Sequence, residues 1–498
     1  MPVVITRWNA ARLVRLLGWG AVGLSLGVGA CLSDDEGDLT EPPDASHCPA
    51  ETPDYCGSVC VDTQTDLSHC GACGAACVPG SQGVEVACDA GTCKVTECEP
   101  TFADCDGLAE NGCEVDTTRS AAHCGTCGNA CSTQCLAGEC NDVVEVSAGA
   151  QFTCAVRKSG SVWCWGDNTW ENLGAGESLL PGENLSPVKV KLDADAEHVA
   201  VNQNNDRKHA CAVLKDGGLV CWGANGNGQI GLGDTKLTAV PAPVGLADVA
   251  AVAPGGRHTC AITQSLKLYC WGNNFDGQVG TGDGMPDHWT PQEVKTSAQQ
   301  VVSGRKHSCA RFLNASVQCW GSNALGQVGN GSATETYPTP VPISFSGGFS
   351  LLSSGLDHTC AVDSGKILCW GSNAQGQVGL APGMPVLTPN ELGVTEMSEL
   401  ALGTQSSVAL GRSGIWGWGD NTSGQLGLGN TGPVSTPTPT LAGLGKVAQL
   451  AMGLDHACAL MASGALLCWG NNDAGQLGVG NKTSSTQPVA VAFPPEGI

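Results

Sequence analysis

Positive charge is scarce in this chain. Its 498 residues include 23 Lys and Arg against 47 Asp and Glu, which gives a formal net charge of −24. Phosphate recognition needs a basic footprint, so we expect no nucleic-acid partner. Charged residues make up only 14% and aromatic residues 5% of the chain, whereas glycine is abundant at 70 residues. That balance favours short strands and tight turns over helices.

Motifs of common catalytic sites are missing as well. The sequence contains no G-x-S-x-G, no H-E-x-x-H and no phosphate-cradling loop, since Gly226-Asn227-Gly228 belongs to a repeated turn. We therefore predict that the chain is not an enzyme and has no cofactor. A hydrolase with a site at the centre of the fold and a structural envelope protein remain the alternatives.

Long apolar runs are absent apart from one near the N-terminus. Arg7, Arg12 and Arg15 precede the apolar stretch 16–30, which is the pattern of a signal peptide. The stretch ends in Val28-Gly29-Ala30-Cys31 and resembles a bacterial lipobox. That resemblance implies removal of 1–30, lipid attachment at Cys31, and an exported protein at the outer membrane or cell surface. An ordinary signal peptide is the alternative, and the acidic stretch 31–47 reads as a disordered tether.

The chain is rich in cysteine, with 29 residues, and in one repeated unit. The unit reads G-x-x-H-x-C-A, a short turn, and C-W-G-x-N-x-x-G-Q-[LIV]-G. It recurs about every 50 residues, a period typical of propellers and solenoids. The tryptophans of its W-G step are Trp165, Trp222, Trp271, Trp320, Trp370, Trp418 and Trp469.

Cysteines of the repeats come in pairs. An exported chain favours disulfides, and a pair facing across a hairpin lies close enough to bridge. In the sixth repeat Val408 and Gly417 replace both cysteines together, as expected for bonded partners. Free buried thiols are the alternative. The predicted bridges are Cys154–Cys164, Cys211–Cys221, Cys260–Cys270, Cys309–Cys319, Cys360–Cys369 and Cys458–Cys468.

Sixteen further cysteines fill the region 48–142 and form two modules of eight, each with the string H-C-G-x-C-G-x-A-C. An even count favours four disulfides per module over zinc or an iron–sulfur cluster, although the sequence does not give the pairing. The second module also carries a weak calcium candidate, because spaced oxygen ligands suit that ion but also occur in ordinary turns. Its residues are Asp104, Asp106, Asn111 and Glu114.

Each repeat contains about four short strand signals, for example 249–253, 259–263, 266–271 and a step at Val294. Four strands per repeat predict a propeller blade. We therefore predict an all-β chain with a seven-bladed β-propeller over 143–498, preceded by the small disulfide-rich region. The last repeat ends at 488–491 without a following strand, so we expect 143–146 to complete it and close the ring.

The repeat resembles the regulator of chromosome condensation family. Trp271-Gly272-Asn273-Asn274 with Gly277-Gln278-Val279-Gly280 is a clean copy, and the likeness covers 143–498. It implies a seven-bladed propeller. The eukaryotic founder of the family acts on nucleosomes and a nuclear GTPase, but an acidic exported chain suits neither partner. The tryptophan that a light-sensing relative carries after the first glycine of G-x-x-H is absent at all seven copies.

Repeats differ most in the two residues between that glycine and the histidine. By the resemblance, these loops lie on one face of the ring. The second to fourth copies supply cations and the fifth and seventh supply Leu-Asp, which predicts a positive arc opposite an acidic and apolar arc. We expect this face to bind a protein or glycan. The candidate residues are Arg207, Lys208, Arg257, Arg305, Lys306, Leu356, Asp357, Leu454 and Asp455.

Overall fold

The computed structural model describes residues 48–78, 83–108, 111–132, 134–136, 138–176, 179, 181–284, 286–333, 336–345, 348–441 and 444–494. The predicted signal peptide, the tether and Cys31 lie outside these residues. The chain divides into two compact units, 1–76 with 88–92 and 77–87 with 93–498. Within the described residues every regular element is a strand, and no helix there is long and apolar enough to cross a membrane.

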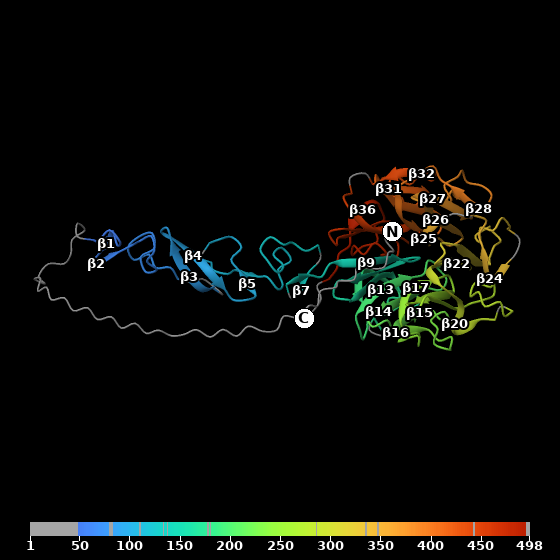
Figure 1. Cartoon of the computed structure of the whole chain (residues 1–498), viewed down its shortest axis with the longest axis horizontal. Coiled ribbons are helices and arrows are strands. Elements are labelled where there is room, and N and C mark those ends of the chain that lie inside the picture. Colours follow the sequence, from blue (N-terminus) through green and yellow to red (C-terminus); the bar gives the residue numbers. More distant parts are fainter. Residues whose placement is uncertain are drawn as a thin grey trace, which may run out of the picture. The chain divides into compact units, whose positions relative to one another are not determined.

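Seven four-stranded antiparallel sheets form the propeller (Figure 1). Each sheet is built from four consecutive strands, and the first strands of neighbouring sheets contact one another around the centre. The blades are, in order, β9 (Val143–Ala148), β10 (Phe152–Arg157), β11 (Val162–Asp167), β12 (Glu183–Lys189); β13 (Ala196–Val201), β14 (His209–Leu214), β15 (Leu219–Gly223), β16 (Thr238–Pro243); β17 (Val249–Pro254), β18 (His258–Thr263), β19 (Lys267–Gly272), β20 (His288–Thr296); β21 (Ala298–Ser303), β22 (His307–Phe312), β23 (Val317–Ser322), β24 (Thr336–Pro342); β25 (Phe349–Ser354), β26 (His358–Asp363), β27 (Lys366–Gly371), β28 (Val386–Glu391); β29 (Met397–Leu402), β30 (Ser406–Gly411), β31 (Gly414–Gly419), β32 (Val434–Thr440); and β33 (Val447–Met452), β34 (His456–Met461), β35 (Leu466–Gly470), β36 (Ser485–Ala490).

The predicted shared strand is wrong. β9 pairs with β10 of the first blade, and β36 pairs with β35 of the last. Every blade is therefore complete within its own repeat, and side chains close the ring between blades 7 and 1. Gln449 of β33 supplies one such link, because its amide accepts from Val146 N–H (3.0 Å) and donates to Val146 C=O (3.1 Å).

The hydrophobic core is divided among the blade junctions. Seven clusters of buried side chains each combine residues of two neighbouring blades, and each contains one tryptophan of the W-G step. All seven tryptophans are fully buried. Burying such a ring removes a large apolar surface from water at every junction, so the blades are stable only against one another.

The hairpin cysteines pair as predicted. Cys154 lies opposite Cys164 in the β10–β11 ladder, and the other five pairs share that register. Their Cα atoms are 4.0–4.1 Å apart, as in a non-hydrogen-bonded pair. Val408 faces Gly417 at the corresponding place in blade 6. The fifth pair keeps its register because its turn shortens to Ser364-Gly365, where both residues have positive φ.

Outer strands share a feature that the sequence analysis missed. Each has a proline just before the residue that faces the second hairpin cysteine or Gly417. A proline lacks an N–H, so it weakens an exposed strand as a template for pairing with another chain. The lateral edges of the propeller are thus protected against sheet extension. These residues are Pro187, Pro241, Pro291, Pro340, Pro389, Pro437 and Pro488.

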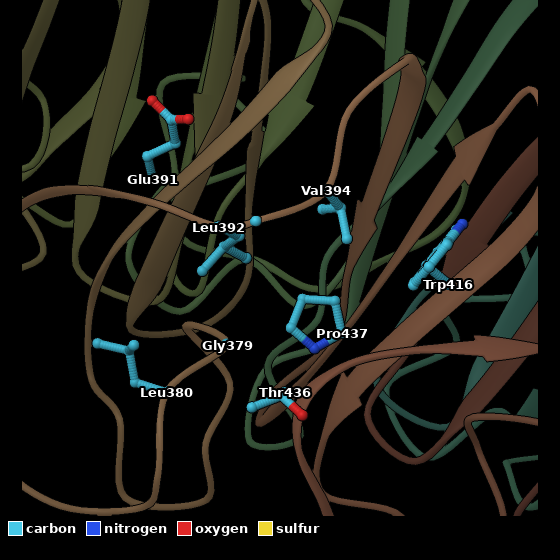
Figure 2. A pocket seen from close by; sticks show the side chains of 9 residues that line it. Gly379, Leu380, Glu391, Leu392, Val394, Trp416, Thr436 and Pro437 are labelled. Carbon is cyan, nitrogen blue, oxygen red and sulfur yellow. The ribbon is translucent and has the colours of Figure 1, made fainter.

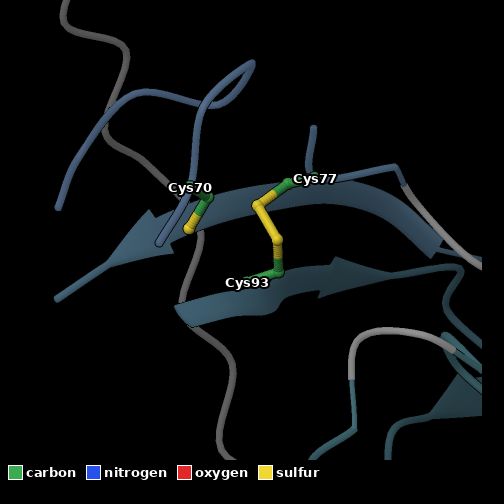
Figure 3. A group of neighbouring side chains, drawn as sticks. All are labelled: Cys70, Cys77 and Cys93. Carbon is green, nitrogen blue, oxygen red and sulfur yellow. A yellow bond between two sulfur atoms is a disulfide. The ribbon is translucent and has the colours of Figure 1, made fainter. Parts of the chain in front are cut away.

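The disulfide-rich region contains four short hairpins: β1 (Asp54–Cys56) with β2 (Val59–Val61), β3 (Gly83–Asp89) with β4 (Thr92–Cys98), β5 (Phe102–Ala103) with β6 (Val115–Asp116), and β7 (Cys135–Leu136) with β8 (Glu139–Cys140). All sixteen cysteines are bonded, in the same order in both modules: first with third, second with fifth, fourth with seventh and sixth with eighth. Figure 3 draws one bridge, Cys77–Cys93, and Cys70, which is bonded to Cys88. The bridges are Cys48–Cys60, Cys56–Cys73, Cys70–Cys88, Cys77–Cys93, Cys98–Cys113, Cys105–Cys127, Cys124–Cys135 and Cys131–Cys140.

Candidate functional site: the loop face of the propeller

One end of the ring, here called the loop face, carries the connections between first and second strands and between third and fourth strands of every blade. These connections contain the two motif segments, G-x-x-H and G-x-N-x-x-G-Q. They are anchored by hydrogen bonds that repeat from blade to blade, so the loops are held on a rigid frame. Variable side chains at their tips are therefore the part of the ring available for recognition.

The tryptophan of the W-G step anchors the third-to-fourth-strand loop of the preceding blade. Its Nε1–H donates to a backbone carbonyl at 2.8–2.9 Å, which belongs to the motif glutamine in six cases and to Asn172 in one. Trp165 reaches Gln476 in this way, so the junction between blades 7 and 1 has the same link as the others.

The motif histidines anchor the inner loops to the following blade. Each Nε2 lies 2.8–2.9 Å from a serine or threonine hydroxyl of that blade, as in His258 with Ser308. The Ser308 hydroxyl donates to Gln278 C=O, so it accepts from an Nε2–H of the imidazole. Burial lowers the pKa to about 4 for His209 and to about 3 for His258, His307, His358 and His456. These histidines are neutral residues of the framework.

Two junctions lack this link, and both partners change together. Phe152 and Ser406 replace the histidine in blades 1 and 6, and the following blades have Ala210 and Ala457 where a hydroxyl would be. Ser406 is fully buried, and its Oγ has no hydrogen-bond partner among the described residues.

The inner loop of blade 2 is longer than the others, spanning 202–208 where blade 1 has only 149–151. Gln203 in this insertion extends its amide to two carbonyls on the opposite side of the ring, those of Leu402 and Met452 (2.5 and 2.9 Å). Asn204 binds the carbonyl of Gly256 in blade 3. The insertion thus spans the centre of the loop face and ties blade 2 to blades 3, 6 and 7.

The predicted positive arc is largely neutralised by acids of the chain itself. Arg305 forms a two-point ion pair with Asp357, through Nε–Oδ1 (3.1 Å) and Nη2–Oδ2 (2.5 Å). Arg257 pairs with Asp206 (3.5 Å) and Lys306 with Asp276 (3.1 Å). These pairs reduce the net charge of the predicted positive arc, and Asp357 of the predicted acidic arc belongs to the pair with Arg305. Binding through this face stays a prediction.

Lys208 and Arg207 differ from those three cations. Lys208 is 3% exposed and binds Asp167 and Gln151. It therefore links these loops inside the protein, and it is not available to contact a partner, contrary to the prediction. The Arg207 guanidinium lies over the ring of Trp170, 5.1 Å from its centroid. Such stacking keeps the charge at the surface while fixing the side chain.

Acidic character persists at the other predicted arc. Asp455 in blade 7 has its pKa raised to about 6 by burial and by the neighbouring carboxylates Asp420 and Asp473. Burial also raises the pKa of Asp357, although Arg305 opposes that effect. Leu356 and Leu454 are half-buried and serve mainly through their backbones, since Leu356 C=O accepts from Arg305 N–H and Leu454 N–H donates to Gly149 C=O.

The most exposed aromatic ring on the loop face was not identified from the sequence. Phe275 is 76% exposed at the tip of the blade 3 loop, and Trp289, at the start of β20, is 47% exposed. Asn273 N–H in the same loop donates to the backbone C=O of Arg257, and Asp276 pairs with Lys306, so the loop that carries Phe275 is fixed to two of the candidate segments. Trp289 contacts Gly228 of blade 2. The signal was available in the sequence, because the other six repeats have no aromatic residue at the place of Phe275.

The calcium candidate in the second cysteine module has its carboxylates close together. Ligand oxygens of Asp104, Asp106 and Glu114 lie within 4.8 Å of one another. However, Asp104 accepts from Gly107 N–H, Glu114 accepts from Cys105 N–H, and Asp106 accepts from Leu108 N–H and the Asn111 amide. These hydrogen bonds lower the pKa of Asp106 and are those of ordinary turns. Calcium binding stays a prediction.

Comparison with known proteins places the ring in a family. A model described as the RCC1-like domain matches residues 112–385, more than half of the chain. The chain belongs to the RCC1-like domain family. Models of the regulator of chromosome condensation repeat also match residues 413–460 and 463–497.

Curated relatives match over short stretches. The Ultraviolet-B receptor UVR8 of Arabidopsis thaliana is 34% identical over 118 residues, which cover 22% of this chain and 24% of the receptor. The human regulator of chromosome condensation is 34% identical over 114 residues, covering 22% of this chain and 26% of that protein. These matches thus span about a quarter of each relative.

Solved structures extend the likeness over the ring. Yeast RCC1 (Prp20) bound to Kap60 superposes with a TM-score of 0.59 at 20% identity and covers 70% of this chain and 85% of its own. Human WBSCR16 gives a TM-score of 0.57 at 21% identity and covers 64% and 87%. At these identities the likeness shows the fold alone.

Proposed function

We propose that this chain is a surface-anchored, non-catalytic binding lipoprotein that recognises a partner protein through the loop face of blades 2–4. The observation that carries the proposal is Phe275, a 76% exposed ring on a loop that is held by a hydrogen bond to the Arg257 backbone and by the Asp276–Lys306 ion pair. Aromatic residues are enriched among the anchor residues of protein interfaces. They are unusual on a chain with only 5% aromatic residues.

The family supports a protein partner over a small substrate. Yeast RCC1 (Prp20) is bound to Kap60 in one solved structure, and a second structure of Prp20p is described together with its binding properties to Gsp1p and histones. An acidic chain with a signal-peptide pattern gives no reason to expect those partners here, and we expect neither a nuclear GTPase nor nucleic acid. The paired state of the cations favours a partner that contacts apolar and aromatic surface first, with charges fixing orientation. A glycan partner is an alternative outcome of the tests.

An enzyme with a site at the centre of the ring is less favoured, because Gln203 spans that position on the loop face and binds the opposite blades. A purely structural role gives no reason for an apolar ring to be exposed at Phe275.

The test places a photo-crosslinking amino acid at position 275 in cells that express the full chain. We expect one discrete crosslinked partner. The matched control carries the same group at Leu313, which is 56% exposed on the opposite end of blade 4, and should give none. Phe275→Ala with Trp289→Ala should reduce binding of the identified partner at least tenfold while leaving the melting temperature unchanged. Equal crosslinking at both positions would refute the assignment.

Anchoring is tested separately. Cys31→Ala should release the protein from the membrane fraction, because stable attachment needs the acylated cysteine. The propeller should remain folded, as judged by thermal unfolding. Membrane partition that is unchanged in the variant would contradict the lipoprotein part of the proposal.

A further inference from the structure

A pocket opens on the propeller at the junction of blades 5 and 6, away from Phe275. Its volume is about 360 Å³, and its walls are mostly apolar. Figure 2 shows Leu392 and Leu380 on one side, Trp416 on the other, and Val394 and Pro437 between them. Ligand pockets commonly range from about 300 to 1,000 Å³, so this one suits a single large side chain.

The same place between blades 7 and 1 is filled by the chain itself. Phe493 follows β36 at the position that Val394 has after β28, and Trp163 has the position of Trp416. Phe493 packs edge-on against Trp163 (centroids 6.3 Å apart) and Trp165 (5.6 Å). Arg157 covers this pair, 5.2 Å from the Phe493 ring. The junction of blades 7 and 1 thus shows that a phenylalanine ring fits at this place.

At the junction of blades 5 and 6, both the aromatic ring and the cation are replaced by smaller residues. Val394 stands in place of Phe493, and Gly411 stands in place of Arg157 on the strand that pairs with the strand of Trp416. Other junctions keep larger groups there, for example Lys295 over Phe312 between blades 3 and 4 (5.4 Å). The pocket is therefore the space that a phenylalanine ring and a cation occupy in the equivalent junction.

Charge at the rim also matches that pair. Glu391 lines the pocket, is exposed, and forms an ion pair with Lys366 (2.9 Å). The chain as a whole carries −24. A basic residue next to the inserted ring is thus favoured over an acidic one.

We propose that this pocket is a second docking site, which takes a phenylalanine side chain from an extended, basic segment of a partner protein. The ring packs edge-on against Trp416, as Phe493 does against Trp163. Aromatic pairs of this geometry add to the burial of apolar area, which gives the site a preference for aromatic over aliphatic side chains.

The probe is a synthetic peptide with the sequence of residues 489–494, Val-Ala-Val-Ala-Phe-Pro, extended by one lysine. Titration calorimetry on the full chain should detect saturable binding. Replacing the phenylalanine of the peptide by alanine should weaken binding at least tenfold. Replacing it by leucine should weaken binding less.

Val394→Phe installs the filler found in blade 7 and should abolish peptide binding. Trp416→Leu removes the ring that contacts the ligand and should weaken binding at least tenfold, so it decides the matter if the first variant does not fold. Phe275→Ala is the matched control and should bind the peptide like the unaltered chain, because the loop-face site is separate.

Absence of binding to the unaltered chain, or equal binding by Val394→Phe, overturns the proposal. A peptide lacking phenylalanine that binds as well also overturns it. Analytical sedimentation tests whether a second copy of the chain occupies the pocket instead. If the unaltered chain is a dimer and Val394→Phe is a monomer, Phe493 of a second copy fills the pocket. That result would contradict a separate partner protein.

Discussion

Two junctions of the same ring are built very differently. Between blades 7 and 1, His456 binds Thr153, the Gln449 amide makes both of its bonds to Val146, and Phe493 packs against Trp163. Between blades 6 and 7, Ser406 stands in place of the histidine, and Ala457 stands in place of its hydroxyl partner. Blade 6 also lacks the hairpin disulfide. The junction where the first and last blades meet is thus the more strongly linked of the two.

Inner strands show the same contrast. Glu399 of β29 stands where blades 4 and 7 have Gln300 and Gln449. It accepts from Leu450 N–H (2.8 Å), and burial raises its pKa to about 7. The neighbouring inner strands present Leu351 and Gln449 at this level, so no described cation compensates the carboxylate. A ring without a shared strand needs extra links where its ends meet, whereas an internal junction tolerates their loss.

The largest effect is expected at the closing junction. Arg157 is 1% exposed, donates to Asn141 C=O (3.1 Å), and stacks on Trp163 and Phe493. Arg157→Ala removes these contacts and leaves buried acceptors unmatched, so the free energy of unfolding should fall by about 3–4 kcal/mol. Urea titration measures the change. Arg412→Ala, which changes an exposed arginine of blade 6, is the control. A loss of unfolding free energy below about 1 kcal/mol in Arg157→Ala would contradict a stabilising role of Arg157 at this junction.

The next effect depends on pH. The folded pKa of Glu399, about 7, is above its ordinary value of 4.5, so folding takes up a proton between these values. Its contribution is favourable below about pH 4.5 and is lost as the pH rises through 7, which costs about 3 kcal/mol. Glu399→Gln should therefore raise stability by about 2–3 kcal/mol at pH 8 and change little at pH 4. Denaturant titration at both pH values tests this, with the exposed Glu391→Gln as control. A gain of equal size at both pH values would contradict the mechanism.

The smallest effect should come from restoring the missing bridge. Val408 and Gly417 face one another in the register of the other pairs, so Val408→Cys with Gly417→Cys should form a disulfide. Its short loop predicts a gain of about 1–2 kcal/mol. The gain is limited because a Cβ at Gly417 would lie 3.1 Å from Thr440 and 3.2 Å from Leu426, which must shift. Thermal unfolding with and without reductant measures this gain in stability. A lower melting temperature in the oxidised form would show that Thr440 and Leu426 cannot move aside.

Repetition made the fold readable from the sequence. The strand positions of blade 3 follow from a pattern that recurs seven times, and the hairpin register of Cys154 with Cys164 follows from one that recurs six times. Ring closure was not readable, since the expectation of a shared strand at Val143 rested on counting strands at the chain ends. Only the structure shows that β36 completes its own blade.

The candidate site was less predictable, because ion pairs depend on which loops adjoin. Arg305 and Asp357 lie in different repeats, and nothing local in either repeat reveals that they meet. Gln203 was hidden for a similar reason, since its partners Leu402 and Met452 are on the far side of the ring. Phe275 could have been found by asking which repeat has an unusual residue at a loop tip.

Short spacing of the bonded cysteines has a consequence for how the chain matures. Partners in the fourteen described bridges are between 9 and 22 residues apart. Close partners meet far more often than distant ones, because loop closure is easiest over short lengths. In an oxidising compartment the six hairpin bridges of the propeller can each form before the next cysteine arrives, because their partners follow one another directly in the sequence. The two modules differ, because Cys48–Cys60 encloses Cys56 and Cys98–Cys113 encloses Cys105. Pairing in the order of synthesis would therefore be wrong there, and we expect thiol–disulfide exchange to be needed only in the region 48–140.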